Sequence, residues 1–199
     1  MKIISLASAH SSQIHLDILK KGGIIIYPSS NCYGICCDIF NETAVNRISL
    51  IKNRKIRKPY TILVRDKKHF TEYGQHNSLV DYYLKTYPYL LFTFVVPRSS
   101  KIPESFNAGY PTIAIMLAQG IERDLFYTYP NALVNTSANK AKMNNCFDVE
   151  QICIQLSNTL EYIDLIIDGG TLPPAPSSTI IKISNNHHKI LRGGLNNGD

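Results

Sequence analysis

The feature that most constrains the fold is a glycine pair followed at once by a short apolar segment. A pattern of apolar residues at helical spacing begins at Ser11 or Ser12. Gly22 and Gly23 end this pattern, as a left-handed helix cap would. Residues 24–27 then read Ile-Ile-Ile-Tyr, with no charged side chain on either face. This segment therefore predicts a strand that is covered on both sides.

The rest of the chain alternates between strand-like and helix-like segments. A loop within residues 32–38 leads into a second short strand. Further strands are expected at residues 60–64, 90–96, 112–117, 132–135, 164–167 and 178–183, the last pairing as a hairpin with 189–192. Helices are expected at residues 41–54 with Asn41 as the cap, 78–85, 121–127 and 149–156. The alternation predicts an α/β chain, and the hairpin requires a mixed sheet.

Composition excludes a disordered chain and leaves the partner class open. The chain has 199 residues, 44% of them hydrophobic, and 21 Lys+Arg against 15 Asp+Glu give a net charge of +6. This apolar content is near that of a globular domain, and the length fits one domain. A basic excess of this size suits phosphate-bearing partners such as nucleotides or RNA. A basic protein without such a partner fits equally well.

Cysteine usage and the apolar segments indicate a cytoplasmic protein. Five cysteines are an odd number, which argues against a disulfide scaffold and fits a reducing compartment. Their spacing matches no zinc site, so no metal site is expected. The first nine residues imitate a signal peptide, but the apolar stretch is shorter than the ~7–15 residues required. No stretch approaches the ~20 apolar residues of a membrane span, so we expect no membrane partner.

Small polar side chains follow the strand at residues 24–27. Ser29, Ser30 and Asn31 stand directly beyond it. In open α/β sheets, ligands bind beyond the carboxyl ends of strands. Hydroxyl and amide groups there can hydrogen-bond a polar ligand without filling its space. Considered alone, the segment is also explained by an ordinary Ser/Asn turn.

A run of cations forms a second candidate site. Five of the seven residues from 52 to 58 are Lys or Arg, and the run leads directly into the strand at 60–64. Lys and Arg bind phosphate oxygens, Lys as a point charge and Arg as a bidentate fork. A solvated run that caps the preceding helix explains the pattern equally well.

Further polar groups adjoin other expected strands. Residues 135–139 read Asn-Thr-Ser-Ala-Asn and provide more hydrogen-bonding side chains than a turn needs. Residues 168–170 (Asp-Gly-Gly) and 192–194 (Arg-Gly-Gly) combine glycines with a charged group beside strands, and residues 177–179 (Ser-Ser-Thr) place three hydroxyl groups before a strand. Each group alone is weak evidence for a binding site, and the order of the groups along the chain is more informative.

In this order the motifs resemble those of the YrdC-type threonylcarbamoyl-AMP synthase family, which includes the YciO branch. Residues 22–38 resemble its Gly-Gly strand and the following P-T-x-T-x-Y-G-x-x-C-D motif. Residues 51–64 resemble its I-K-x-R-x-x-x-K-P-x-x-x-L-V motif. Its T-S-A-N, D-G-G, P-S-T and L-R-x-G motifs correspond to residues 136–139, 168–170, 177–179 and 191–194.

The resemblance implies a fold and an activity. The fold is a YrdC-like α/β fold: a twisted, open, mixed parallel and antiparallel sheet with helices on its faces. We expect it as a single domain over residues 1–199, with a core at about 12–194. Members form threonylcarbamoyl-AMP and pyrophosphate from L-threonine, bicarbonate and ATP with Mg2+. Other tRNA-modification proteins then pass the group to a tRNA adenosine, so the resemblance implies an ATP-binding nucleotidyltransferase of the short form.

The resemblance also implies roles for individual residues. The catalytic residues would be Lys52 and Arg54. The nucleotide would be held by Lys52, Arg54, Lys58, Thr93, Ser137, Asn139 and Arg192. The amino acid would lie near Ser29, Asn31, Thr136 and Ser178. No protein nucleophile is needed, because a carbamate formed from threonine and CO2 attacks the α-phosphorus.

Some positions depart from the family pattern. Met116 stands where the family commonly has an Arg that would pair with the threonine carboxylate. Residues 89–92 replace a P-G-P segment, and Ala141 and Lys142 replace Ser-Gly. These departures leave a second hypothesis open, a diverged paralogue that binds nucleotide, tRNA or double-stranded RNA without synthase activity. A third hypothesis is a structural member of a tRNA-modification complex.

Overall fold

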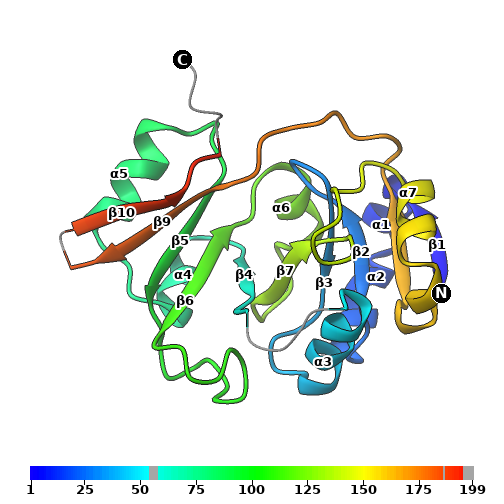
Figure 1. The fold of residues 1–199 in the computed structure, drawn as a ribbon, viewed down its shortest axis with the longest axis horizontal. Coiled ribbons are helices and arrows are strands. Elements are labelled where there is room, and N and C mark those ends of the chain that lie inside the picture. The colour runs from blue at the N-terminus through cyan, green and yellow to red at the C-terminus, as the bar shows by residue number, and fades with distance from the viewer. Residues whose placement is uncertain (54–57, 186, 195–199) are drawn as a thin grey trace.

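The computed structural model describes residues 1–53, 58–185 and 187–194, and its strands form one mixed sheet (Figure 1). The strands are β1 (Lys2–Ser5), β2 (Ile25–Pro28), β3 (Tyr33–Cys36), β4 (Thr61–Val64), β5 (Phe92–Pro97), β6 (Thr112–Leu117), β7 (Leu133–Ser137), β8 (Leu165–Asp168), β9 (Thr179–Ser184) and β10 (His187–Arg192). They are ordered β1-β8-β2-β3-β7-β4-β6-β5-β9-β10. The pairs β1–β8, β2–β8, β4–β6 and β5–β9 are parallel, and the other pairs are antiparallel. The predicted fold class is confirmed.

The helices begin at the small polar residues that sequence rules favour. They are α1 (Leu6–Ser12), α2 (Ile14–Lys20), α3 (Glu42–Ile51), α4 (Lys67–Tyr73), α5 (Ser78–Thr86), α6 (Gly120–Phe126) and α7 (Val149–Gln155), with a 3-10 helix at Ser157–Tyr162. Asn41 caps α3 as predicted, because its Oδ1 accepts a hydrogen bond from the Ala44 amide at 2.9 Å. Gly22 follows α2 with φ 78°, and the Gly23 amide donates to the Ile18 carbonyl at 2.8 Å. The predicted glycine cap is thus confirmed.

Alternating side chains divide the sheet into two apolar faces. Ile26 belongs to the core cluster on the first face, whereas Ile25 and Tyr27 belong to the cluster on the second. All three are fully buried, as the prediction of a strand covered on both sides requires. Buried residues of α3, α4, α5 and α7 join the first cluster, and those of α1, α2 and α6 join the second.

The N-terminal region differs from the sequence prediction. The helix expected to start at Ser11 or Ser12 is instead two helices, because Gln13 adopts φ 50° between α1 and α2. Before them, β1 pairs in parallel with β8 at the edge of the sheet. Ala9 of α1 is fully buried in the second-face cluster. A short edge strand with three exposed residues out of four carries little apolar signal, which explains why β1 was not expected.

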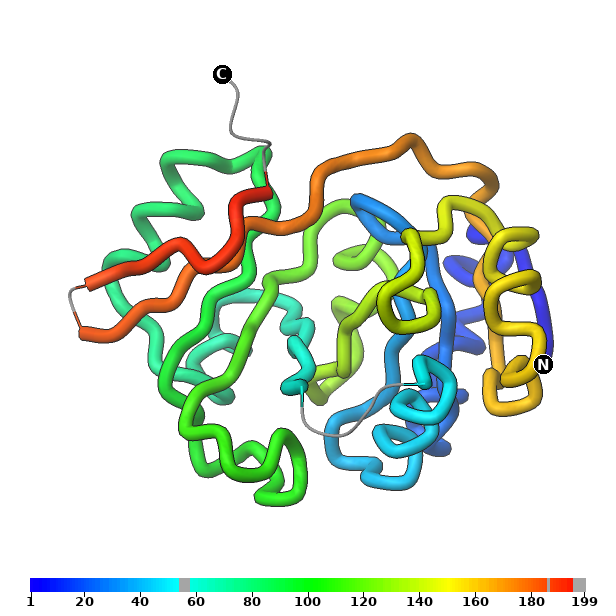
Figure 2. The backbone as a smooth tube through the Cα atoms, in the orientation of Figure 1, coloured from blue at the N-terminus to red at the C-terminus, as the bar shows by residue number. Residues whose placement is uncertain are grey.

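A long connection links the two ends of the sheet. Residues 169–178 lead from β8 to β9, and Figure 2 shows them as the orange tube that crosses over the molecule. The crossing brings Ser177 and Ser178 over the second face. The strands β9 and β10 then form the predicted hairpin, in which Asn185 has a φ of 53°. Within the described part of the chain, no helix is long and apolar enough to cross a membrane.

Candidate active site

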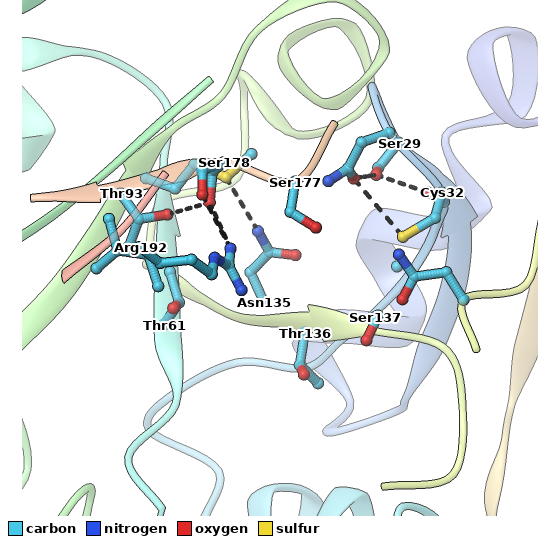
Figure 3. A pocket seen from close by; sticks show the side chains of 15 residues that line it. Ser29, Cys32, Thr61, Thr93, Asn135, Thr136, Ser137, Ser177, Ser178 and Arg192 are labelled. Atoms are coloured by element: carbon cyan, nitrogen blue, oxygen red, sulfur yellow. Dashed lines mark hydrogen bonds between the residues drawn. The ribbon is translucent and has the colours of Figure 1, made fainter. Parts of the chain in front are cut away.

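A polar cavity of about 230 Å3 lies on the second face of the sheet (Figure 3). In Figure 3, Ser29 and Cys32 lie on one side, and Thr93, Ser178 and Arg192 lie on the other. The complete lining is Ser29, Asn31, Cys32, Gly34, Thr61, Thr93, Met116, Asn135, Thr136, Ser137, Asn145, Ser177, Ser178, Ile180 and Arg192. The lining has one full charge, on Arg192, and is otherwise hydroxyl, amide and apolar.

Strand register assembles this cavity from distant parts of the sequence. Arg192 is paired with Ile180, which in turn is paired with Thr93. Thr93 is paired with Met116 on β6. Paired residues point to the same face of a sheet, so these four side chains form one row across four strands. Thr61 and Asn135 are paired in the neighbouring row.

The Thr93 side of the cavity is a linked group of polar side chains. Thr93 Oγ1 and Ser178 Oγ are 2.8 Å apart and share a hydrogen bond. Arg192 Nη2 donates to the Ser178 carbonyl at 2.9 Å and reaches Ser178 Oγ at 3.4 Å. Thr93 and Ser178 are buried, whereas Arg192 belongs to an exposed edge strand. These bonds hold the guanidinium at the cavity wall.

On the opposite side, the turn after β2 is fixed by its own hydrogen bonds. Ser29 Oγ donates to the Cys32 carbonyl at 2.6 Å and approaches Asn31 Oδ1 at 3.1 Å. Burial raises the pKa of the Cys32 thiol to about 11, which keeps it protonated at neutral pH. The thiol therefore lines the cavity as a neutral group and not as a nucleophile.

Lys52 is a buried cation at the end of α3, only 5% exposed. Its Nζ donates to the carbonyls of Ser137 and Asn139 and to Asn139 Oδ1, the latter two at 3.0 Å. Ser137 Oγ also donates to Asn139 Oδ1 at 2.7 Å, and Asn139 Nδ2 donates to the Met143 carbonyl at 2.6 Å. The ammonium thus ties the end of α3 to the turn that follows β7.

A second, wider cavity of about 550 Å3 adjoins the first. Thr136 and Ser137 line both, so the two cavities are neighbours that share part of their wall, and together they are called the groove. The other residues that line the wide cavity are Lys52, Asn53, Lys58, Asn139, Ala141 and Lys142. Three lysines and no acidic residue are among them. One end of the groove is therefore nearly neutral and the other is cationic.

With this geometry established, comparison with known proteins identifies the family. The sequence model of the Sua5/YciO/YrdC family, which carries the description "Telomere recombination", matches residues 17–194. The chain belongs to this family. The match covers the two glycines before β2 and extends through the last strand, which confirms the predicted family.

Curated relatives in the family carry the name of a synthase. A threonylcarbamoyl-AMP synthase of Vibrio cholerae is 26% identical over 171 residues, which cover 83% of this chain and 89% of the relative. A Methanocaldococcus jannaschii protein, provisionally given the same name, is 30% identical over 199 residues, covering 98% and 92%. These family names describe a transferase that acts in tRNA modification.

A solved family structure supports the fold. The crystal structure of Sua5 from P. abyssi complexed with L-threonine superposes with a TM-score of 0.83 at 21% sequence identity. The alignment covers 96% of this chain and 57% of the Sua5 chain, so this chain spans little more than half of that protein. The likeness therefore extends over nearly the whole chain.

The structure brings the predicted site residues together. Arg54 lies outside the described residues; the other predicted residues line one or both cavities. Ser29, Asn31, Thr93, Ser178 and Arg192 line the narrow cavity, Thr136 and Ser137 line both, and Lys52, Lys58 and Asn139 line the wide one. Thr136 and Ser137 belong to β7 itself, whereas the sequence placed them just after the strand.

Several lining residues were missed from the sequence. Thr61 begins β4 and reaches the site because its register partner is Asn135. Asn145 lies in a loop with no recognised motif. Neither carries a local signal, and only sheet pairing or tertiary folding brings them to the groove. Asn135 was part of the polar segment 135–139 that the sequence singled out, but it was assigned no binding role.

The D-G-G motif acts at a distance from the groove. The Tyr33 hydroxyl donates to the Gly170 carbonyl at 2.8 Å, accepts from the Gly169 amide at 2.9 Å, and lies 3.4 Å from Asp168 Oδ1. Burial raises the pKa of Tyr33 to about 12, so the hydroxyl keeps its proton. The motif thus fixes the start of the 169–178 connection to β3.

Glu122 is a fully buried carboxylate that the sequence did not single out. Its Oε1 accepts from the Ser30 amide at 3.0 Å and its Oε2 accepts from Ser30 Oγ at 2.7 Å. These bonds join α6 to the turn that carries Ser29 and Asn31. Burial raises the pKa of Glu122 above its ordinary value, although the two bonds from Ser30 oppose the shift.

This raised pKa predicts a pH dependence of stability. A carboxyl whose pKa is higher in the folded state binds its proton more tightly there than in the unfolded chain. The wild type should therefore lose unfolding free energy relative to Glu122→Gln as pH rises from about 4, the unfolded range of Glu. Chemical denaturation of both proteins from pH 4 to 7 measures the difference. A difference that stays constant across that range would contradict the prediction.

Proposed function

We propose that this chain is a threonylcarbamoyl-AMP synthase, a nucleotidyltransferase that uses ATP, L-threonine and bicarbonate and releases pyrophosphate. The observation that supports this most is the groove of two adjoining cavities, one nearly neutral and one cationic. The wide part falls within the ~300–1,000 Å3 typical of small-molecule sites. Such a groove suits a small polar substrate and a polyphosphate substrate that are bound next to each other. The product would serve threonylcarbamoyl modification of a tRNA adenosine by partner proteins.

In this proposal the residues divide between two substrates. Ser29, Asn31, Thr136 and Ser178 would bind the amino acid through hydroxyl and amide groups. Thr93, Ser137, Asn139 and Arg192 would hold the nucleotide, and Lys58 would face its phosphates together with Arg54. Lys52 would place positive charge beside the reacting phosphate from its buried position.

The reaction needs alignment and charge stabilisation more than acid-base chemistry. Threonine's amine and bicarbonate form a carbamate with loss of water. A carbamate oxygen then attacks the α-phosphorus of ATP, and the bond to the β-phosphate oxygen breaks as pyrophosphate leaves. Two anions must be held together, and charge moves to the leaving group. Fixed cations and donors can stabilise that charge because they are already oriented in the folded protein.

Magnesium is expected with ATP, but the groove offers it no ligand set of its own. No acidic side chain is among the lining residues of either cavity. Across the described residues there is also no group of three or more His, Cys, Asp or Glu side chains that could hold a metal ion. Mg2+ prefers phosphate and water oxygens with one or two carboxylates. In this proposal the metal would therefore arrive on the phosphates.

Threonine-dependent pyrophosphate release tests the proposed activity. The protein is incubated with ATP, L-threonine, bicarbonate and Mg2+, and each substrate is omitted in turn. We expect pyrophosphate only when all three substrates are present. Folded protein that releases no pyrophosphate, or the same amount without threonine, would contradict the proposal.

One observation favours a second candidate function. Met116, where the resemblance expects an Arg, lines the cavity, and Asn135 Nδ2 lies 3.6 Å from its sulfur. A thioether cannot pair with an amino-acid carboxylate. The alternative is a paralogue that binds nucleotide, or tRNA or double-stranded RNA, without making the adduct. Salt-sensitive tRNA binding combined with no synthase activity would support it, whereas binding that ignores salt would count against it.

A further inference from the structure

Lys142 has a backbone conformation that its side chain does not favour. Its φ is 71°, in the left-handed region where glycine is the usual residue. The turn around it is held by two hydrogen bonds, from the Met143 amide to the Lys140 carbonyl at 3.0 Å and from the Ala141 amide to the Lys52 carbonyl at 2.9 Å. Strained backbone tends to occur at functional sites, so the Lys142 side chain is a candidate for a functional role.

The strained turn forms part of the wide cavity. Lys142 lines it, and so does Asn53, which also has a positive φ of 46°. The hydrogen bond from Ala141 to Lys52 joins the two turns directly. Two segments about 90 positions apart in the sequence are thus fixed against each other where a ligand would lie.

The charge of the cavity is not shared equally by its three lysines. Lys52 is 5% exposed, and its ammonium already donates to three protein oxygens. Lys58 and Lys142 are both exposed at the cavity. The ammonium groups of Lys58 and Lys142 can move to contact a ligand, whereas the ammonium group of Lys52 is held in place by its hydrogen bonds.

We propose that Lys142 binds the terminal phosphates of a nucleoside triphosphate and so favours it over a monophosphate. The inference rests on the proposed function for the direction of the ligand in the groove, with the nucleoside toward Thr93 and the phosphates toward the lysines. Lysine binds phosphate as a point charge without fixed geometry, which suits a side chain at an open rim. Lys142 is then a specificity-determining residue at the cationic end.

Direct binding measurements on three variants test this role. Lys142→Gln removes the charge, and Lys142→Gly removes it while relieving the left-handed strain. Lys140→Gln removes an equal charge two positions away, at a residue that lines neither cavity. Calorimetry would measure the affinities for ATP, inorganic tripolyphosphate and AMP, and thermal unfolding would measure stability.

We expect both Lys142 variants to bind ATP and tripolyphosphate about five- to tenfold more weakly, with AMP affinity unchanged. Lys140→Gln should match the wild type for all three ligands. Lys142→Gly should unfold at the wild-type temperature or above. Its weaker binding would then result from the lost charge and not from unfolding. ATP affinity that is unchanged in Lys142→Gln, or AMP affinity that falls as much as ATP affinity, would overturn the proposal.

Two further outcomes distinguish the phosphate-binding role of Lys142 from the proposed synthase activity and from RNA binding. If wild-type protein makes no adduct but ATP binding still depends on Lys142, the proposed activity fails and the phosphate role stands. If tRNA binding weakens in Lys142→Gln while ATP binding does not, the side chain contacts RNA phosphates and the proposal is overturned.

Discussion

Replacing Lys52 with methionine is expected to lower the unfolding free energy by about 2–4 kcal/mol, because three oxygen acceptors would each lose a hydrogen bond from a buried ammonium. The Ser137 and Asn139 carbonyls and Asn139 Oδ1 all accept hydrogen bonds from Lys52 Nζ. Methionine keeps the length and apolar stem of lysine but donates nothing. Adduct formation should fall by roughly 100-fold or more, because the turn after β7 and the fixed charge are lost together.

Two comparisons make the Lys52 prediction specific. Lys20 stands near the end of α2 as Lys52 stands at the end of α3, but its side chain is 60% exposed. Lys20→Met should change stability by less than ~0.5 kcal/mol. Lys52→Arg keeps the positive charge, but a planar guanidinium cannot replace one ammonium nitrogen that contacts three oxygens. This variant should therefore recover little synthase activity. Denaturation and pyrophosphate assays measure these effects, and wild-type stability in Lys52→Met would refute this account of the turn.

Replacing Arg192 with glutamine is expected to separate binding from stability. Arg192 is exposed on the edge strand β10 and is held by Ser178, with its guanidinium at the wall of the narrow cavity. Arg192 lies beside Thr93 in the nucleotide site that we propose, so loss of the guanidinium donors should weaken ATP binding by roughly 10- to 30-fold. Stability should change by less than ~1 kcal/mol, because β10 packs little of the core.

Lys189 provides the matched control for Arg192. It lies on the same exposed strand and does not line either cavity. Lys189→Gln should leave ATP affinity at the wild-type value. Equal weakening in both variants, measured by calorimetry at fixed ionic strength, would show that only general surface charge matters.

The buried strands were predictable because their sequences are continuous and apolar. β2 follows a glycine cap and is covered on both faces, and both features can be recognised from the residue types at 22–27. The start of the chain and α4 were not predicted. Phe70 and Tyr73 bury the inner face of α4, but the surrounding residues are polar and the helix has only seven residues. Short amphipathic segments of this kind give too few repeats of the helical period to be recognised.

The site was predictable where its residues adjoin strand ends and form a motif. Thr136, Ser137 and Asn139 are examples, since the segment contains more polar side chains than a turn requires. Thr61 and Glu122 were not predictable for different physical reasons. Thr61 depends on strand register, whereas Glu122 looks like an ordinary acid in the first turn of a helix until its burial is known.

The folded chain places part of the excess positive charge at one site. The sequence left nucleotide binding and a solvated basic surface equally open for residues 52–58. The structure buries Lys52 and brings Lys58 beside Lys142 at one cavity. Part of the basic excess is therefore concentrated at the groove that we propose as the ATP site.

Incorporation of labelled bicarbonate into an adenylate tests the central proposal most directly. The protein is incubated with 13C-bicarbonate, L-threonine, ATP and Mg2+, and the products are resolved by mass spectrometry. The account predicts threonylcarbamoyl-AMP that carries the label at its carbamoyl carbon, formed in equal amount to pyrophosphate. Pyrophosphate without the labelled adduct, or no product from folded protein that binds ATP, would contradict it.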